Sequence, residues 1–166
     1  MQRKIAAFSK DEQSDWVAAL ECGHERHTRH QPPLSERPWV VTEQGRASRL
    51  GTTIECKRCE RREVPSGYAP YRRTATFTAD SVPKGLLSRH TTARGIWARI
   101  HVEAGRLRYR LHEPFFEELI LEPGTTGVVL PGVAHEVEPL EGARFFVEFL
   151  RPPGAAKPPQ RIEGAQ

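Results

Sequence analysis

One cysteine and three histidines of this chain fall within the stretch ECGHERHTRH, residues 21–30. The other two cysteines form a CxxC pair, Cys56 and Cys59, in the stretch ECKRCE. Structural zinc is held by four nitrogen or sulfur ligands in a tetrahedron, usually supplied as two close pairs. Cys22 and His24 can be the second pair, because side chains two residues apart at the end of a strand lie on one face. These four residues are the predicted zinc ligands.

The histidine spacing leaves the fourth ligand open. His24, His27 and His30 recur at every third residue, which would align them along one side of a helical turn. His24 is the first choice and His27 the second, whereas His30, followed by QPP, fits a surface position or one just outside the ligands. A redox CxxC is the rival chemistry. It usually begins a helix after a strand of a βαβ unit, and no such pattern surrounds Cys56.

The first part of the chain has little apolar material for a core, and small domains of this kind usually need a staple. A structural zinc contributes on the order of 10 kcal/mol to folding, comparable with the net stability of an ordinary domain. We therefore expect a zinc-binding module over residues 1–64 and a second domain over residues 70–152, with VPSGYAPY as the linker between them. Residues 153–166, rich in Pro, Gly and Ala, are expected to form a flexible tail.

Short predicted elements position the zinc ligands. KIAAF and DWVAALEC flank the polar turn KDEQSD, a pattern typical of a β-hairpin that delivers Cys22 and His24 at its end. The sequence WVV, residues 39–41, is expected to form a third strand. Thr42 is the expected N-cap of a short helix over EQGRASRL, with Gly51 as its stop. TTIECKRCE then predicts a strand that runs into the CxxC turn, so the module is α+β.

The second part of the chain is predicted to be all β. GIWARIHVEAGRLRYRLHEP contains two runs in which apolar and polar residues alternate, joined at EAG. The apolar positions are Ile100, Val102, Leu107, Tyr109 and Leu111. Further short segments, each closed by Pro or Gly, follow at intervals of about 8 to 12 residues. The predicted fold class is therefore mainly β, a barrel or sandwich behind a small N-terminal α+β module.

Composition limits the compartment and the partners. A chain with 37% apolar and 28% charged residues is typical of a soluble globular protein, and its apolar runs fall far short of the roughly 20 residues that span a membrane. No secretory signal is evident, so we expect a cytoplasmic protein whose cysteines stay reduced. The net charge of +4 permits an acidic partner. Glutamates interleave with the arginines beside the predicted zinc ligands, which argues against nucleic-acid binding.

The Cys/His segment resembles a family. The run CGHERHTRHQPPLSERPWVVTEQGRASRLGTTIECKRC, residues 22–59, is similar to a short bacterial domain of unknown function. That domain carries a CGHxxHxRHxPPxxxRPWVxT block followed by a closing CxxC. The resemblance implies that relatives share the Cys and His constellation, and it brings no activity with it.

The second part of the chain carries another resemblance. RRTATFTADSVPKGLLSRHTTARGIWARIHVEAGRLRYR, followed by LEPGTTGVVLPGVAHEVEPLEGARFFVEFLRP, spans about residues 71–152. This stretch is similar to the small YeaR-like cupins, which also occur as the N-terminal domain of TehB-type tellurite-resistance methyltransferases. The resemblance implies a cupin-type β-barrel. It does not extend to methyl transfer, because no glycine-rich loop lies between a strand and a helix.

Cupins commonly hold a metal inside the barrel through two histidines and a glutamate of one motif and a histidine of a second. In this chain Ala98 falls at the glutamate position, so the ordinary ligand set is absent. The resemblance implies a rearranged site in which His90, His135 and Glu148 hold a second divalent metal. The simpler alternative is a pair of hydrogen-bonded histidines, with Glu148 paired to an arginine such as Arg99.

Two classes of function stay open at this point. By resemblance, the chain would act in the response to tellurite, related oxyanions or oxidative stress, through a metal or small anion bound in the barrel. If it is an enzyme, the mechanism is metal-assisted: His90 and His135 hold the ion, and Glu148 ligates it or moves a proton. The alternative is a non-enzymatic metal sensor or adaptor whose barrel mediates homodimer formation. A zinc module that binds nucleic acid ranks below both.

Overall fold

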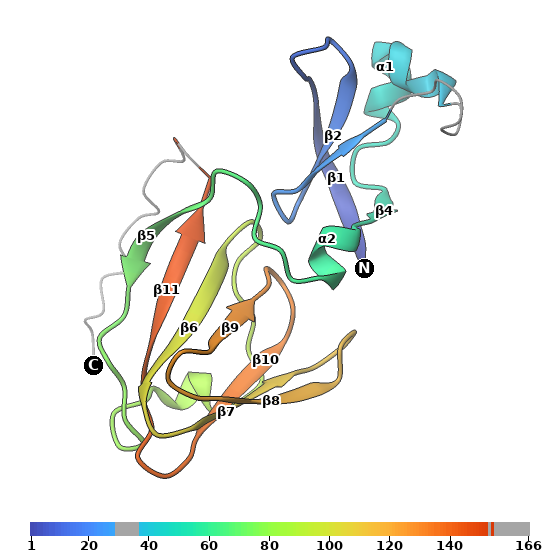
Figure 1. Ribbon diagram of the computed structural model, residues 1–166. Coiled ribbons are helices and arrows are strands. Elements are labelled where there is room, and N and C mark those ends of the chain that lie inside the picture. The colour runs from blue at the N-terminus through green and yellow to red at the C-terminus, as the bar shows by residue number, and fades with distance from the viewer. Residues whose placement is uncertain (29–36, 153, 155–166) are drawn as a thin grey trace, which may run out of the picture.

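The computed structural model describes residues 1–28, 37–152 and 154 (Figure 1). Within these residues the chain forms eleven strands, two α-helices and two 3₁₀-helices, which confirms the prediction of a mainly β protein. None of the helices in this described part is long and apolar enough to cross a membrane. The predicted flexible tail, residues 153–166, lies outside the described residues apart from residue 154.

The N-terminal part is built on a four-stranded antiparallel sheet in the order β3-β2-β1-β4. Its strands are β1 (Gln2–Lys10), β2 (Trp16–Leu20), β3 (Glu25–His27) and β4 (Thr53–Glu55). The carboxylate of Asp11 fixes the β1–β2 turn by accepting hydrogen bonds from the N–H groups of Gln13 and Asp15 at 3.0 and 2.9 Å. The predicted hairpin is therefore confirmed.

The third strand predicted at residues 39–41 is wrong. These residues lie in the 3₁₀-helix η1 (Pro38–Val41). Pro38 begins this helix, and its ring holds φ near the helical value. Val40 is the residue of η1 that the fold buries, and the ring of Trp39 packs edge-on against that of Phe8 on β1.

The helix predicted after η1 is present but shorter. The side chain of Thr42 accepts a hydrogen bond from the N–H of Gly45 at 3.1 Å and caps α1 (Glu43–Ala47), as predicted. The helix ends at Ala47, three residues before the predicted end at Leu50. The chain then passes through β4 into α2 (Lys57–Glu60), which contains the second cysteine of the CxxC pair.

The rest of the chain forms two antiparallel sheets (Figure 1). One has the strand order β10-β7-β8 and the other β5-β11-β6-β9. Their strands are β5 (Ala69–Arg73), β6 (Trp97–Ala104), β7 (Leu107–Leu111), β8 (Glu117–Leu121), β9 (Thr126–Val129), β10 (His135–Pro139) and β11 (Arg144–Arg151). A 3₁₀-helix, η2 (Lys84–Leu86), lies between β5 and β6.

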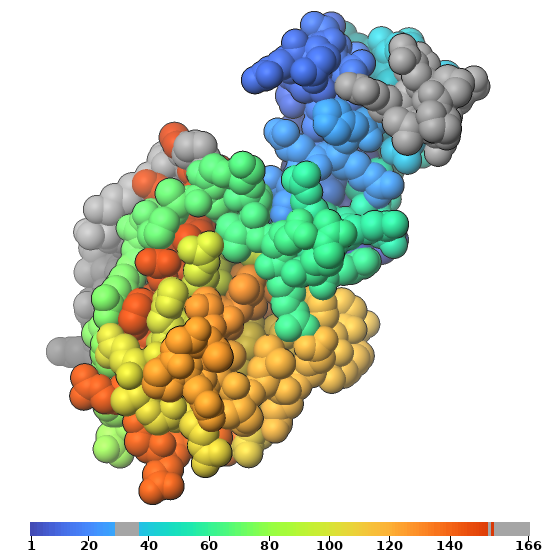
Figure 2. Space-filling model, in the orientation of Figure 1, coloured from blue at the N-terminus to red at the C-terminus, as the bar shows by residue number. Residues whose placement is uncertain are grey.

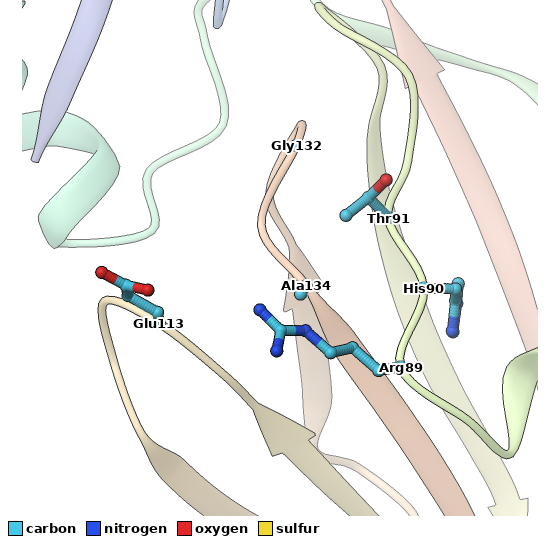
Figure 3. A pocket seen from close by; sticks show the side chains of 6 residues that line it. All are labelled: Arg89, His90, Thr91, Glu113, Gly132 and Ala134. Carbon is cyan, nitrogen blue, oxygen red and sulfur yellow. The ribbon is translucent and has the colours of Figure 1, made fainter.

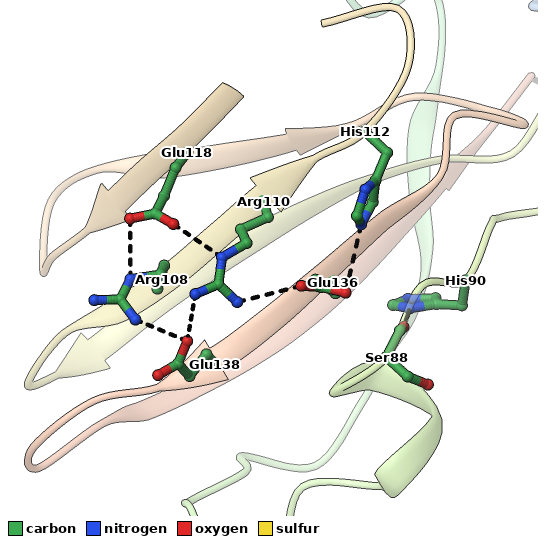
Figure 4. Close-up of polar contacts among 8 residues, drawn as sticks. All are labelled: Ser88, His90, Arg108, Arg110, His112, Glu118, Glu136 and Glu138. Carbon is green, nitrogen blue, oxygen red and sulfur yellow. Dashed lines mark hydrogen bonds and ion pairs between the residues drawn. The ribbon is translucent and has the colours of Figure 1, made fainter. Parts of the chain in front are cut away.

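Strands β6 and β7 show the alternation that the sequence predicts. The buried positions are Ile100, Val102, Leu107, Tyr109 and Leu111. On the opposite face of β7, Arg108 and Arg110 each form ion pairs with Glu118 and Glu138 (Figure 4). Apolar inner faces and paired charges on an outer face explain why these strands form a two-sided sheet.

The N-terminal part forms a smaller lobe beside the larger one (Figure 2), yet the buried core is continuous between them. The apolar residues around Cys22, Cys56 and Cys59 belong to the same buried cluster as those of β6, β7 and β11. A polar contact adds to this junction, since the Nη1 of Arg3 donates to the carbonyl of Pro131 at 2.8 Å. The two lobes are therefore packed against each other rather than merely linked.

Candidate metal centre

A tight turn after β2 presents Cys22 and His24. Within it the N–H of Leu20 donates to the carbonyl of His24, and the N–H of Gly23 donates to the carbonyl of Leu20, both at 2.8 Å. Gly23 has a φ of 88°, a conformation that residues with a Cβ rarely adopt. An added Cβ there would also overlap the hydroxyl oxygen of Tyr68. Both conditions require glycine between the two ligands.

The CxxC pair arrives from the other edge of the sheet. Strand β4 pairs antiparallel with β1, and just beyond it the N–H of Cys56 donates to the carbonyl of Met1 at 2.7 Å. Cys56 is the N-cap of α2, and Cys59 lies within that helix. The predicted passage from a strand into the CxxC turn is therefore confirmed, and the short helix brings both sulfurs to the turn after β2.

The four predicted zinc ligands come together in one buried cluster, here called the Cys/His centre: Cys22, His24, Cys56 and Cys59. The Nδ1 of His24 lies 3.5, 3.4 and 3.6 Å from the three Sγ atoms in that order, and all four ligand atoms lie within 4.8 Å of one another. A tetrahedral zinc with Zn–S of about 2.3 Å and Zn–N of about 2.0–2.1 Å separates nitrogen from sulfur by about 3.6 Å. The arrangement therefore fits zinc.

Burial gives the Cys/His centre a closed character. The four residues are at most 5% exposed, and four protein ligands fill a tetrahedral coordination sphere. A catalytic zinc keeps one position for water or substrate, whereas a structural zinc does not. The Cys/His centre has the composition and the enclosure of the structural type.

The thiols and the imidazole compete for protons in this cluster. The hydrogen bond between Cys22 and Cys56 raises the pKa of Cys22 and lowers the pKa of Cys56. Burial alone would lower the pKa of His24, but hydrogen bonds to Cys56 and Cys59 outweigh it and raise that pKa to about 9. The cluster thus favours a positive charge at its middle, and a divalent metal bound there would displace these protons.

Two aromatic residues outside the Cys/His segment enclose the centre. Trp97 is fully buried, its Nε1–H donates to the carbonyl of Cys22 at 2.7 Å, and its ring meets the ring of His24 at 79° with centroids 5.4 Å apart. Tyr68 lies against Gly23 from the linker side. Nothing in the sequence pattern pointed to these contacts, because an aromatic at the start of a strand signals a core position in any β protein.

The other histidines of the first segment do not join the centre. His27 has a side chain that is 58% exposed, and its Nδ1 lies 3.2 Å from the carboxylate of Asp11. Its position opposite Val17 on β2 places it beyond the turn that holds His24. The alternative of His27 as the fourth ligand is therefore not supported. His30, the remaining alternative, lies outside the described residues.

In the TehB-resembling part of the chain, His90 and His135 form a pair. Their backbones exchange two hydrogen bonds, of 3.0 and 2.9 Å, and their ring centroids are 4.2 Å apart. Each Nδ1 lies 2.9 Å from a backbone carbonyl oxygen, that of Ser88 for His90 (Figure 4) and that of Val133 for His135. Each Nδ1 therefore carries a proton that it donates to its carbonyl oxygen. Burial lowers the pKa of His135 to about 4, so its imidazole is neutral at pH 7.

Glu148 does not reach this pair. Its carboxylate lies 3.6 Å from the Nε2 of His101 and 4.0 Å from Arg99, which flank the buried Ile100 on β6 and so mark the outer face of that sheet. His135 is buried on the other sheet. The predicted site of three ligands is corrected accordingly. Among the residues described by the structure, the Cys/His centre is the single group of three or more such side chains placed to hold a metal.

A pocket of about 490 Å³ opens beside the histidine pair (Figure 3). Its lining residues are Arg89, His90, Thr91, Glu113, Gly132 and Ala134. Figure 3 shows the side chain of Arg89 extending from one side of the pocket and Glu113 lying at the opposite side. Apart from His90, no sequence pattern pointed to these residues, because charged side chains on loops carry no periodic signal.

Comparisons with known proteins bear on both parts of the chain. Residues 6–63 match the model of a protein family of unknown function, DUF3565, and residues 72–147 match the TehB-like domain. A solved protein of Escherichia coli strain K12 is 23% identical with a TM-score of 0.51, over 55% of this chain and 97% of its own. TehB from Haemophilus influenzae is 23% identical with a TM-score of 0.49, over 52% of this chain and 32% of its own. No curated protein matches the sequence.

These similarities differ in what they show about the fold and the activity of this chain. At 23% identity, the Escherichia coli protein shows a shared fold and nothing about activity. This chain spans 32% of the length of TehB, so the activity of that whole protein does not carry over. The four residues of the Cys/His centre all fall inside the DUF3565 match, and the histidine pair falls inside the TehB-like match. The chain therefore matches the DUF3565 model in its first part and the TehB-like model in its second, as the two resemblances in its sequence predicted.

Proposed function

We propose that this chain is a metal-binding protein in which Cys22, His24, Cys56 and Cys59 hold one structural zinc ion. The observation that carries the proposal is the near-equal spacing of the His24 Nδ1 from the three sulfurs, 3.4 to 3.6 Å, which matches a tetrahedral edge. Thiolate and imidazole ligands in a tetrahedron favour zinc among the common divalent ions. All three cysteines are free thiols, which a reducing compartment such as the cytoplasm would preserve.

The role of this chain at the proposed site is to bind the zinc ion and to shield it from solvent. Zinc, when bound, would supply four strong bonds that add to the small apolar core of the N-terminal sheet. The turn at Gly23 and the start of α2 orient the ligands, and the surrounding apolar side chains exclude water. This enclosure favours the structural role over a metal sensor, which needs an ion that exchanges readily.

A test of the site compares two histidines of the same segment. His24→Ala should reduce zinc from one ion per chain to a small fraction, because it removes a buried ligand. His27→Ala should keep the full ion, because that side chain is exposed and paired with Asp11. Elemental analysis of the two purified variants and the unaltered chain measures this directly. Zinc retained in full by His24→Ala, or absent from the unaltered chain, would contradict the proposal.

For the TehB-like domain, we infer a cupin-type barrel that binds a small ligand, in a response to tellurite, related oxyanions or oxidative stress. The family match supports the general assignment. The pocket beside His90 supports ligand binding, because the guanidinium of Arg89, the hydroxyl of Thr91 and the carboxylate of Glu113 belong to residues that line one concave site. This role covers both an enzyme and a non-enzymatic binding protein, since it rests on the site rather than on a reaction.

A second metal at the His90–His135 pair is the other candidate for this domain. The observation in its favour is that both Nδ1 atoms face backbone carbonyl oxygens, the arrangement by which proteins fix histidine ligands. Two protein ligands hold an ion weakly, so we expect a second metal only when iron(II) or manganese(II) is supplied in excess. Calorimetric titration of the zinc-loaded chain should show this second event, and His135→Ala should remove it while the zinc remains. Equal binding by the variant would exclude the pair as the site.

A further inference from the structure

One buried backbone group of the turn that carries Cys22 has its hydrogen-bond partner outside the turn. Within the turn, the N–H of Gly23 is satisfied by the carbonyl of Leu20. The carbonyl of Cys22 instead accepts the indole Nε1–H of Trp97 at 2.7 Å, across a sequence separation of 75 residues. Trp97 is the first residue of β6 and lies in the TehB-like match. The peptide between Cys22 and Gly23 is thus held in place by a residue of the TehB-like part of the chain.

Burial makes the hydrogen bond between Trp97 and Cys22 important for the conformation of the turn. Trp97 and Cys22 are both 0% exposed, so water cannot replace the indole as the hydrogen-bond donor. A buried carbonyl without a partner is unfavourable, and the peptide would turn to find one. Since Gly23 tolerates many backbone angles, the Cys22–Gly23 peptide could rotate easily and move the side chain of Cys22 away from the other sulfurs.

The same indole also borders the second ligand of the turn. Its ring meets His24 nearly at a right angle, and the Nε2 of His24 is buried without a hydrogen-bond partner. Histidine ligands usually have their other nitrogen fixed by an oxygen acceptor. Here the packed indole ring of Trp97 limits rotation of the His24 imidazole. One residue therefore restrains both Cys22 and His24.

We propose that Trp97 is a positioning residue of the Cys/His centre, so that the TehB-like domain sets how tightly the DUF3565 segment holds its metal. This rests on the zinc site proposed above. Trp97 touches no metal itself and acts through the carbonyl of Cys22 and the ring of His24. The centre is in this sense a joint site of the two domains, whose metal content depends on their correct docking.

The test uses the full chain and two variants. Trp97→Phe keeps an aromatic ring in the core and removes the N–H donor. Phe145→Leu is the matched control, because Phe145 is equally buried, lies on the neighbouring strand β11 and packs against Phe77 rather than the centre. Zinc affinity is measured by competition with a chromogenic chelator, and cobalt(II) in place of zinc reports ligand geometry through its absorption bands. Thermal unfolding of both variants shows how far each one is destabilised.

We expect Trp97→Phe to weaken zinc binding by about 10-fold or more, the usual range for contacts that orient metal ligands, and to shift the cobalt(II) bands. Phe145→Leu should lower thermal stability and leave both the affinity and the bands unchanged. If Trp97→Phe binds zinc like the control and gives the unaltered cobalt(II) spectrum, the inference is overturned while the zinc site stands. If the unaltered chain takes up no zinc, the proposed function falls first and the inference falls with it.

Discussion

Cys59→Ser should leave the chain unable to hold zinc and should unfold its N-terminal sheet. Cys59 is 0% exposed and supplies one of four ligand atoms, and a serine hydroxyl is a poor zinc ligand at neutral pH. The bound ion is worth on the order of 10 kcal/mol to folding, about as much as the net stability of a whole domain. Elemental analysis should find no zinc, and hydrogen exchange should show β1 and β2 unprotected.

A core variant without a ligand role separates metal loss from ordinary destabilisation. Val17 is 2% exposed on β2, and Val17→Ala should cost on the order of 2 kcal/mol through the cavity that it leaves. This variant should keep one zinc ion per chain and retain protection in β1 and β2. The same unfolding temperature for Cys59→Ser and the unaltered chain would contradict a structural role for the centre.

Gly23→Ala should weaken zinc binding by at least 10-fold, for two reasons that add. At a φ of 88° an alanine is strained, at a cost of roughly 1–2 kcal/mol. Its Cβ would also overlap the hydroxyl oxygen of Tyr68, so either the tyrosine or the ligand turn must move. Because Cys22 and His24 flank this glycine, movement of the turn separates the ligands. Competition with a chelator measures the change.

A second glycine provides the control. Gly124 has a φ of 90°, and no atom lies within 4 Å of the position that a Cβ would occupy there. Gly124→Ala should therefore show the backbone strain alone and leave zinc affinity unchanged. Adding Tyr68→Ala to Gly23→Ala should recover part of the lost affinity, since it removes the overlap. Equal affinity for Gly23→Ala and Gly124→Ala would show that the close approach of Tyr68 has no effect on the centre.

The histidine pair and Glu148 show where sequence patterns stop being informative. Because side chains alternate between the two faces of a strand, Phe146 and Glu148 lie on one face of β11, and Phe145 and Val147 lie on the other. Both faces carry an aromatic residue, so the pattern does not say which face is inside. The register with β6 decides this, because it places Glu148 opposite Arg99 and beside His101. The carboxylate of Glu148 therefore has Arg99 and His101 as its partners on the outer face.

The four residues of the Cys/His centre could be predicted to lie together because their side-chain types and local spacing are those of a metal-binding site. A CxxC turn and a Cys-x-His at a hairpin end are local geometries, fixed by residues close in sequence. The same holds for the β1–β2 hairpin and the N-cap of α1. The strand expected at 39–41 failed for a local reason too, since Pro38 starts a helical turn that a run of three apolar residues does not reveal.

The sequence by itself thus determined the four residues of the Cys/His centre, the mainly β class and the two family models that the chain matches. The tertiary structure alone decided that Trp97 and Tyr68 enclose the centre and that His90 pairs with His135 without Glu148. The physical reason is the range of the interactions. Ligand identity and strand alternation are properties of neighbouring residues, whereas the docking of β6 against the turn at Cys22 depends on strand register and on packing between segments far apart in the chain.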